Sequence, residues 1–249
     1  MSQLAVSPDG SVVATGAQDW DASIDDPTPI RLWHLDGQKL VEFSTVDGPP
    51  LGYGIAFTPD GSRLVLGGAN WVTVHPMDGT PPTRIDITGG LEHNETRSLA
   101  VSPDGSTIAV GLWSGSVRLY DIKTGEAMGD DLTSTSRVTD LAFRPDGKQL
   151  VMVNEGGLFG IWDIASRRRL SDASMVAVDR SQTSAPIDAS LTANTEYAMT
   201  ASYIDGEIAV WPLKPDDWID IGCSVFQRDF TNAEKDRFGI EGIAPICPG

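Results

Sequence analysis

The stretch LAVSPDGSTIAVGLWSGSVRLYDIKTG, residues 99–125, contains the unit from which most of the chain is built. Leu99, Ala100 and Val101 alternate between the two faces of an extended strand. Ser-Pro-Asp-Gly then turns the chain, because proline presets φ and glycine accepts a positive φ. TIAVGL is short, apolar and rich in small residues, and VRLYD follows after a polar turn. This order predicts three successive antiparallel strands.

The same pattern recurs along the chain. Its copies begin LAVSPDG at Leu4, IAFTPDG at Ile55, LAVSPDG at Leu99 and LAFRPDG at Leu141, with a degenerate copy, IDASLTANTEY, at Ile187. A period of 42 to 51 residues between these starts indicates a propeller or a solenoid. One small sheet cannot cover both of its apolar faces, so we expect the units to stack radially around a common axis.

These units resemble the WD-repeat family over residues 1–214. The Trp-Asp pair itself survives at Trp162-Asp163, while the equivalent pairs are Trp33-His34, His75-Pro76, Tyr120-Asp121 and Trp211-Pro212. The resemblance implies an all-β fold, a β-propeller of five recognisable blades. Outer strands are expected at residues 39–43, 83–87 and 175–178.

In that family a histidine, an aspartate, a serine or threonine and the tryptophan form a buried hydrogen-bonded network. Here only His93 lies near the histidine position, and the aspartate is matched by Asp205 and, if the long insertion follows it, by Asp19. The other copies have Asn70, Ser114 and Gly156 at that position. We therefore expect the blades to be held mainly by apolar packing.

The two ends of the repeat region leave two alternatives. After Trp211 the chain runs into Lys214-Pro215-Asp216-Asp217, so the last blade is expected to lack its outer strand, and residues 1–6 already serve as the innermost strand of the first blade. One alternative is an incomplete ring, from an N-terminally truncated copy that lacks about two blades and a closing strand. The other is a closed five-bladed ring with one three-stranded blade.

Residues 215–249 form a tail of different composition. Asp216 and Asp217 can cap a short helix, and Thr231-Asn232-Ala233-Glu234 is a capping-box pattern for a second one. The segment from Trp218 to Pro248 resembles the ending of bacterial, especially actinobacterial, multidomain WD-repeat proteins, although Asp229 and Lys235 depart from that pattern. The resemblance implies an N-terminal NTPase or kinase module that this chain lacks. Cys223 and Cys247 are either a disulfide or two half-buried thiols, and they are too few for a zinc site.

Composition limits the partners. A formal net charge of −17 repels phosphate backbones and anionic lipid heads, so nucleic acid and membranes are poor candidates. The chain has no apolar run long enough for a transmembrane helix and no signal-peptide pattern at residues 1–10. We expect a soluble, cytoplasmic protein.

The sequence contains few features that point to a catalytic or metal site. The acidic loop of residues 18–26 has Ile24 and Ile30 where a calcium loop needs glycine and glutamate, so we read it as solvated. The residues provide no phosphate loop, zinc motif or nucleophile elbow. Arg167, Arg168 and Arg169 read as a solvated turn. We expect no cofactor and no enzyme, with a propeller hydrolase as the least favoured alternative.

Binding is the favoured function. In the resembled family, partners engage loops on one face of the disc, and the residues before each second turn fall on that face: Ala69, Trp113, Glu155 and Ile204, with Gln18 less securely aligned. Trp113 is the candidate anchor, because exposed aromatic residues dominate interface energies. The alternative is a tryptophan packed between blades. The sequence therefore predicts a non-catalytic interaction scaffold or sensor module, in a bacterial signalling protein, and the alternative is a propeller fragment without independent activity.

Overall fold

The computed structural model describes residues 2–17, 27–49, 54–87, 95–134, 136–155, 158–174, 187–191, 195–202 and 208–213. These residues form nineteen β-strands, which pair into five antiparallel sheets. In each sheet, strands that follow one another in the chain are hydrogen-bonded neighbours. Four of the sheets have four strands, and the described part of the fifth has three.

The strands follow the repeats of the sequence. The first sheet contains β1 (Ser2–Val6), β2 (Val12–Ala17), β3 (Thr28–Asp36) and β4 (Lys39–Gly48). The second contains β5 (Gly54–Phe57), β6 (Arg63–Gly67), β7 (Trp71–Pro76) and β8 (Thr83–Asp86). The third contains β9 (Thr96–Val101), β10 (Thr107–Leu112), β11 (Ser116–Asp121) and β12 (Leu132–Thr133). The fourth contains β13 (Val138–Phe143), β14 (Gln149–Asn154), β15 (Leu158–Asp163) and β16 (Arg168–Ser174), and the fifth β17 (Ile187–Leu191), β18 (Tyr197–Ser202) and β19 (Ile208–Pro212).

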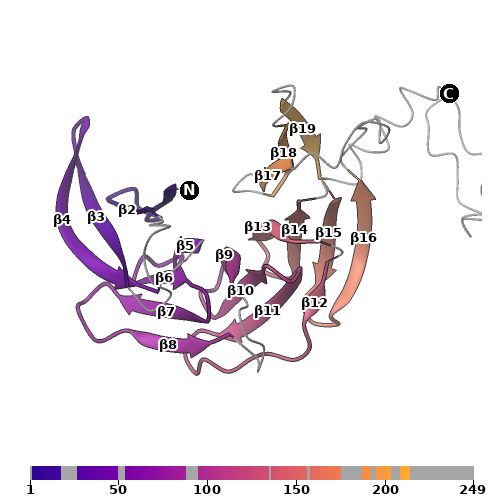
Figure 1. Ribbon diagram of the computed structural model, residues 1–249, viewed down its shortest axis with the longest axis horizontal. Helices are drawn as coiled ribbons and strands as arrows, with labels where there is room; N and C mark the ends of the chain where they lie inside the picture. Colours follow the sequence, from indigo (N-terminus) through magenta and orange to yellow (C-terminus); the bar gives the residue numbers. More distant parts are fainter. Residues whose placement is uncertain are drawn as a thin grey trace, which may run out of the picture.

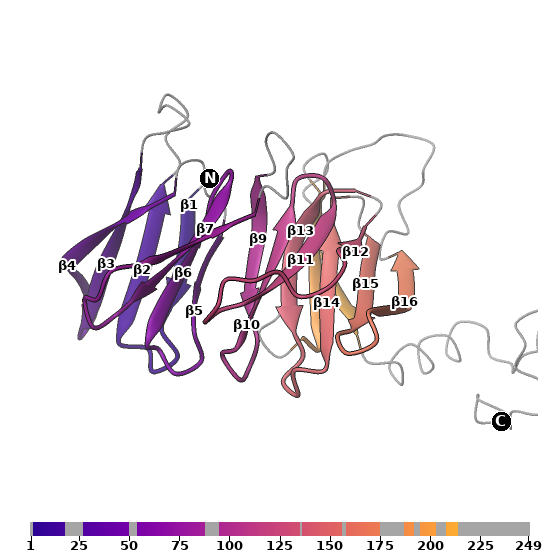
Figure 2. The same cartoon turned by 90° about the horizontal axis from the view of Figure 1, so that it is seen from below.

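The five sheets are blades that fan out from a common centre. Their first strands, β1, β5, β9, β13 and β17, lie next to one another in that order, and the later strands of each sheet lie progressively farther out (Figure 1). Figure 2 shows the blades from the side, with the turns between strands gathered at the two ends of the sheets. The predicted all-β propeller blades, with β1 as the innermost strand of the first, are confirmed.

The blades form an open arc. The first and fifth sheets lie at its two ends and do not stack on each other (Figure 1). In the described residues the fifth sheet ends with β19 as its outermost strand, and the residues that follow β19 lie outside the described part of the chain. Of the two alternatives for the repeat region, the incomplete ring agrees with this arrangement and the closed five-bladed ring does not.

An apolar cluster fills each of the four junctions between neighbouring blades. Each cluster includes side chains from the second and third strands of one blade and from the first and second strands of the next. One example is the third junction, where Val117 and Leu119 of blade 3 pack against Leu141, Leu150 and Met152 of blade 4. Apolar burial of this kind stabilises the stack, as the sequence predicted.

The polar network of the resembled family is only partly present. The indole Nε1 of Trp33 donates a hydrogen bond to the Thr15 hydroxyl at 2.8 Å. Trp162 occupies the equivalent position in blade 4, where its Nε1 is buried and has no hydrogen-bond partner in the described part of the chain. Packing therefore holds this blade without the full network.

Two details of the fourth and fifth blades differ from the predictions. The outer strand of blade 4 is β16, not residues 175–178, because the chain reverses directly after β15. Asp163 accepts hydrogen bonds from the Ser166 amide and hydroxyl in that turn, and Arg167 adopts a φ of 57°. In blade 5 the register makes Ala189, not Ile187, the equivalent of Leu99, since Leu191 pairs with Ala198 as Val101 pairs with Ile108.

The predicted helices of residues 215–249 lie outside the described residues, as do Cys223, Cys247 and the acidic loop of residues 18–26.

Candidate functional site

Trp113 lies in the turn between the second and third strands of blade 3. Its backbone amide donates to the Glu95 carbonyl at 2.9 Å, and Gly115 closes the turn with an amide bond to the Leu112 carbonyl at 3.0 Å. Gly115 has a φ of 89°, a conformation that side-chain-bearing residues rarely adopt. The turn leaves the indole 39% exposed.

Two arginines lie over the indole. The guanidinium carbon of Arg137 is 3.4 Å from the ring centroid, and that of Arg97 is 4.7 Å away. Arg97 belongs to β9 of the same blade, whereas Arg137 directly precedes β13 of the next one. Such contacts attract a cation to the electron-rich face of an aromatic ring. Together they restrict how the exposed indole can move.

Glu155 completes this group from the second turn of blade 4. Its carboxylate lies 3.6 Å from a guanidinium nitrogen of Arg137, and its amide donates to the Arg137 carbonyl at 2.9 Å. The four residues Arg97, Trp113, Arg137 and Glu155, which we call the Trp113 site, thus bridge the turns of two neighbouring blades. The site presents an aromatic surface with charge of both signs.

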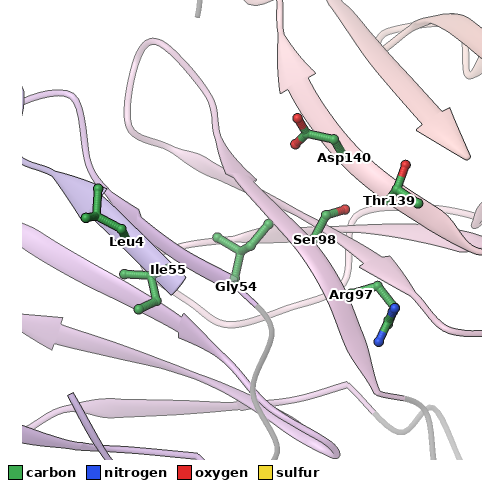
Figure 3. Close-up of a pocket in the computed structure, with 8 residues that line it drawn as sticks. Leu4, Gly54, Ile55, Arg97, Ser98, Thr139 and Asp140 are labelled. Atoms are coloured by element: carbon green, nitrogen blue, oxygen red, sulfur yellow. The ribbon is translucent and has the colours of Figure 1, made fainter. Parts of the chain in front are cut away.

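A pocket of about 230 Å³ lies beside this site, between the inner strands of the first four blades. It is lined by Leu4, Gly54, Ile55, Arg97, Ser98, Leu99, Thr139 and Asp140 (Figure 3). Arg97 lines the pocket and also contacts Trp113, so the pocket and the Trp113 site are continuous.

The polar side chains that line the pocket differ in the hydrogen bonds they make. The Thr139 hydroxyl donates to the Val153 carbonyl at 3.2 Å. Asp140 accepts the amides of Leu141 and Leu191, at 2.8 and 2.7 Å, and so ties blade 4 to blade 5. The Ser98 hydroxyl is buried without a hydrogen-bond partner among the described residues.

The residues singled out in the sequence do not all meet at this site. Trp113 and Glu155 come together through Arg137. Ala69 lies in the equivalent turn of blade 2, where it is buried, so its side chain is not available to a partner. Ile204 and Gln18 lie outside the described residues. The Trp113 ring contacts Arg137 of the next blade and is still partly exposed, and its role as a binding anchor stays a prediction.

Three arginines were not recognised from the sequence. Arg97 and Arg137 were missed because each is an ordinary charged residue just before an inner strand, and no repeat string shows which turn it will meet. Arg167 was read as solvated, but its guanidinium donates to the carbonyls of Met128 and Asp130 in the neighbouring blade. A charged side chain at the edge of blade 4 thus helps to hold blades 3 and 4 together.

The described histidines are placed for packing. His75 lies in β7 at the junction of blades 1 and 2, where burial lowers its pKa, and its Nε2 is 3.2 Å from the Thr73 hydroxyl. His34 stacks on Phe43 with ring centroids 3.8 Å apart. Among the described residues no three histidine, cysteine or acidic side chains are grouped as metal ligands, and no helix there has the length and apolar character to cross a bilayer.

Comparison with known proteins identifies the repeat. Residues 88–121 match the family described as WD domain, G-beta repeat. Relatives include the WD repeat-containing protein SL1-17 of Schistosoma mansoni, which is 30% identical over 156 residues, 62% of this chain and 50% of that protein. The U3 small nucleolar RNA-associated protein 18 homolog of Homo sapiens is 33% identical over 146 residues, 57% of this chain and 26% of that protein. The periodic tryptophan protein 2 homolog of Schizosaccharomyces pombe is 26% identical over 117 residues, 47% of this chain and 14% of that protein.

These relatives are WD-repeat proteins, and a WD40 repeat is present in the third blade. The matches span half or less of the length of these proteins. They come from eukaryotes, so they do not bear on the resemblance of residues 215–249 to actinobacterial endings.

Proposed function

We propose that this chain is a non-catalytic interaction scaffold or sensor module that binds a protein or peptide partner at the Trp113 site. The observation that carries the proposal is the partly exposed indole of Trp113, which Arg97 and Arg137 both contact, beside the pocket that Arg97 also lines. Tryptophan and arginine are the residues that most often contribute large binding energies at interfaces.

The site is arranged before any partner arrives. The indole and both guanidinium groups are held by contacts within the chain, so little side-chain freedom is lost when a partner binds. The pocket adds a concave surface next to this anchor, of a size that accepts one side chain of a bound segment. A rigid aromatic anchor beside a recess is the arrangement expected of a peptide-binding surface.

Charge supports a polypeptide partner over RNA. Two of the relatives are named for a U3 small nucleolar RNA association and for periodic tryptophans, and those names describe those proteins alone. With a net charge of −17, this chain repels a phosphate backbone at long range. A protein partner remains the better fit.

The tail resemblance suggests where such a scaffold works. Residues 215–249 are similar to endings of bacterial multidomain WD-repeat proteins, and this similarity supports a cytoplasmic signalling role beside an NTPase or kinase module. The alternative is a propeller fragment without independent activity. The two differ in whether the Trp113 site binds anything by itself.

A peptide library tests the proposal directly. Random twelve-residue peptides displayed on phage are selected on the immobilised 249-residue chain, and the binding of selected peptides is then measured by fluorescence anisotropy. We expect Trp113→Ala to weaken binding at least tenfold, because a truncated anchor costs about 2 kcal/mol or more.

Trp71→Ala is the matched control. Trp71 in β7 also lies under an arginine, Arg84, at 3.6 Å, but on the outer half of blade 2. Its loss should leave peptide binding unchanged. Selected peptides that bind Trp113→Ala as tightly as the wild type would refute the assignment, and failure to select any binding peptide would favour the inactive-fragment alternative.

A further inference from the structure

Every junction in the arc uses the same two faces of a blade. The face of a blade that packs on the following blade is called its leading face, and the face that packs on the preceding blade its trailing face. At the third junction the leading face of blade 3 supplies Ala109, Val117 and Leu119, all at most 1% exposed. The trailing face of blade 4 supplies Leu141 and Leu150.

The leading face of blade 5 is apolar, and no described residue covers it. Met199 and Val210 pair across β18 and β19 as Ala109 and Leu119 pair across β10 and β11, and Ile208 takes the place of Val117. At these positions in the other four blades the side chains are buried, but Ile208 is 74% exposed, Val210 58% and Met199 41%. Exposed apolar side chains gathered on one sheet face indicate an interaction surface.

The trailing face of blade 1 is likewise left open by the part of the chain that the structure describes. Leu4 and Val6 of β1 correspond to Leu99 and Val101 of β9, which pack against the cluster at the second junction. Here Leu4 is 65% exposed and Val6 51%. Leu35, which follows Trp33 on β3 by two residues, is also exposed. The arc therefore ends in one open leading face and one open trailing face.

We propose that these two end faces bind each other between copies of this chain, in a head-to-tail contact that repeats the junctions inside the arc. A second copy is the occupant we favour because each copy carries both an open leading face and an open trailing face. Within one copy the two end blades lie apart and do not cover each other (Figure 1). The contact is heterologous, since the leading face of one copy meets the trailing face of another.

The net charge of the chain predicts how the head-to-tail contact depends on salt. Each copy has a net charge of −17, so like-charge repulsion opposes an association that apolar burial drives. Added salt screens this repulsion, with a Debye length that falls to about 8 Å at 0.15 M. Self-association should become tighter as salt rises, the opposite of a contact made by ion pairs.

Sedimentation velocity of the 249-residue chain tests the proposal. At roughly 100 μM protein, which populates complexes even at a Kd of about 10 μM, we expect dimers and larger species whose fraction grows with added salt. Val6→Lys disables only the trailing end face and Ile208→Lys only the leading one. Each variant alone should be monomeric, and their equimolar mixture should form dimers and nothing larger, because each partner keeps one working face.

Leu170→Lys is the control, because Leu170 is also exposed but lies on β16 in blade 4, away from both end faces. It should associate as the wild type does. The positions changed to lysine are all exposed, so the thermal midpoints of the variants should match that of the wild type. A wild-type chain that stays monomeric at this concentration and high salt, or an Ile208→Lys variant that still associates, would overturn the proposal. Neither result bears on peptide binding at the Trp113 site.

Discussion

The guanidinium carbon of Arg137 lies 3.4 Å from the centroid of the Trp113 ring, although the two residues belong to neighbouring blades. The contact joins the turn of blade 3 to the residue that precedes the first strand of blade 4. It also sets the position of the aromatic ring of the Trp113 site. We therefore expect the contact between Trp113 and Arg137 to contribute both to partner binding and to the stability of the stacked blades.

The pair can be measured by a double-mutant cycle. Arg137→Gln should destabilise the chain less in a Trp113→Leu background than in the wild type, because the cation has then no aromatic ring to contact. We expect a coupling free energy of about 0.5–1 kcal/mol for this partly exposed pair. Urea denaturation followed by circular dichroism gives the four unfolding free energies. Glu155→Gln removes the exposed ion pair alone and should cost less than about 0.5 kcal/mol.

The Asp60 carboxylate should titrate far below its ordinary range. It accepts a hydrogen bond from the Thr58 hydroxyl at 2.6 Å, and others from the Ser62 amide and hydroxyl, which together lower its pKa from 3.8 to about 2. A lowered folded-state pKa means that the stabilisation is present above about pH 4 and is lost as the pH falls toward 2. Thr58→Val should raise the pKa of Asp60 toward 3.8, as read from the carboxyl carbon shift in an NMR titration.

Asp9 provides the internal control for that titration. The equivalent turn in blade 1 has Ser7 donating to Asp9 at 2.6 Å, and the pKa of Asp9 is likewise about 2. In the Thr58→Val variant Asp9 should keep this value. If Asp60 titrated near 3.8 in the wild type, the turn hydrogen bonds would not be formed in solution.

Gly115→Ala should cost more than the same change at Gly10. Both glycines have positive φ, 89° and 73°, so both substitutions carry a backbone penalty of about 1–2 kcal/mol. A Cβ at Gly10 would meet nothing within 4 Å, whereas at Gly115 it would lie 2.8 Å from the Ser136 carbonyl oxygen. Thermal unfolding should therefore separate the two variants, with Gly115→Ala lower. Equal midpoints would show that the turn beneath Trp113 moves freely.

Repetition is what made the blades predictable. Four copies of the Ser-Pro-Asp-Gly type turn mark where each first strand ends, and the small and β-branched residues after them are the buried second strands. The fifth copy lacks the Pro-Asp-Gly sequence. Thr195 adopts a φ of 54° at the place of the turn glycine, and without that marker the copy was placed two residues too early.

The site was predictable only in part, for a physical reason. The position of Trp113 and Glu155 before a second turn follows from the repeat alone. Whether Arg97 and Arg137 contact the Trp113 ring depends on how the sheets stack, and the sequence of a single repeat does not determine that stacking. The open end faces could not be predicted from the sequence for the same reason. Val210 and Val74 occupy the same repeat position and differ only in whether a neighbouring blade covers them.

These two valines give the most direct test of the open arc. Val74 in β7 pairs with Val65 as Val210 in β19 pairs with Met199, but Val74 is buried at a junction and Val210 is on the open leading face. Val74→Ala should therefore cost about 2 kcal/mol, from lost burial and the cavity left behind. Val210→Ala should stay within about 0.5 kcal/mol in dilute samples, as exposed positions do. Chemical denaturation at low protein concentration measures both, and a cost at Val210 equal to that at Val74 would show that this face is covered within a single copy.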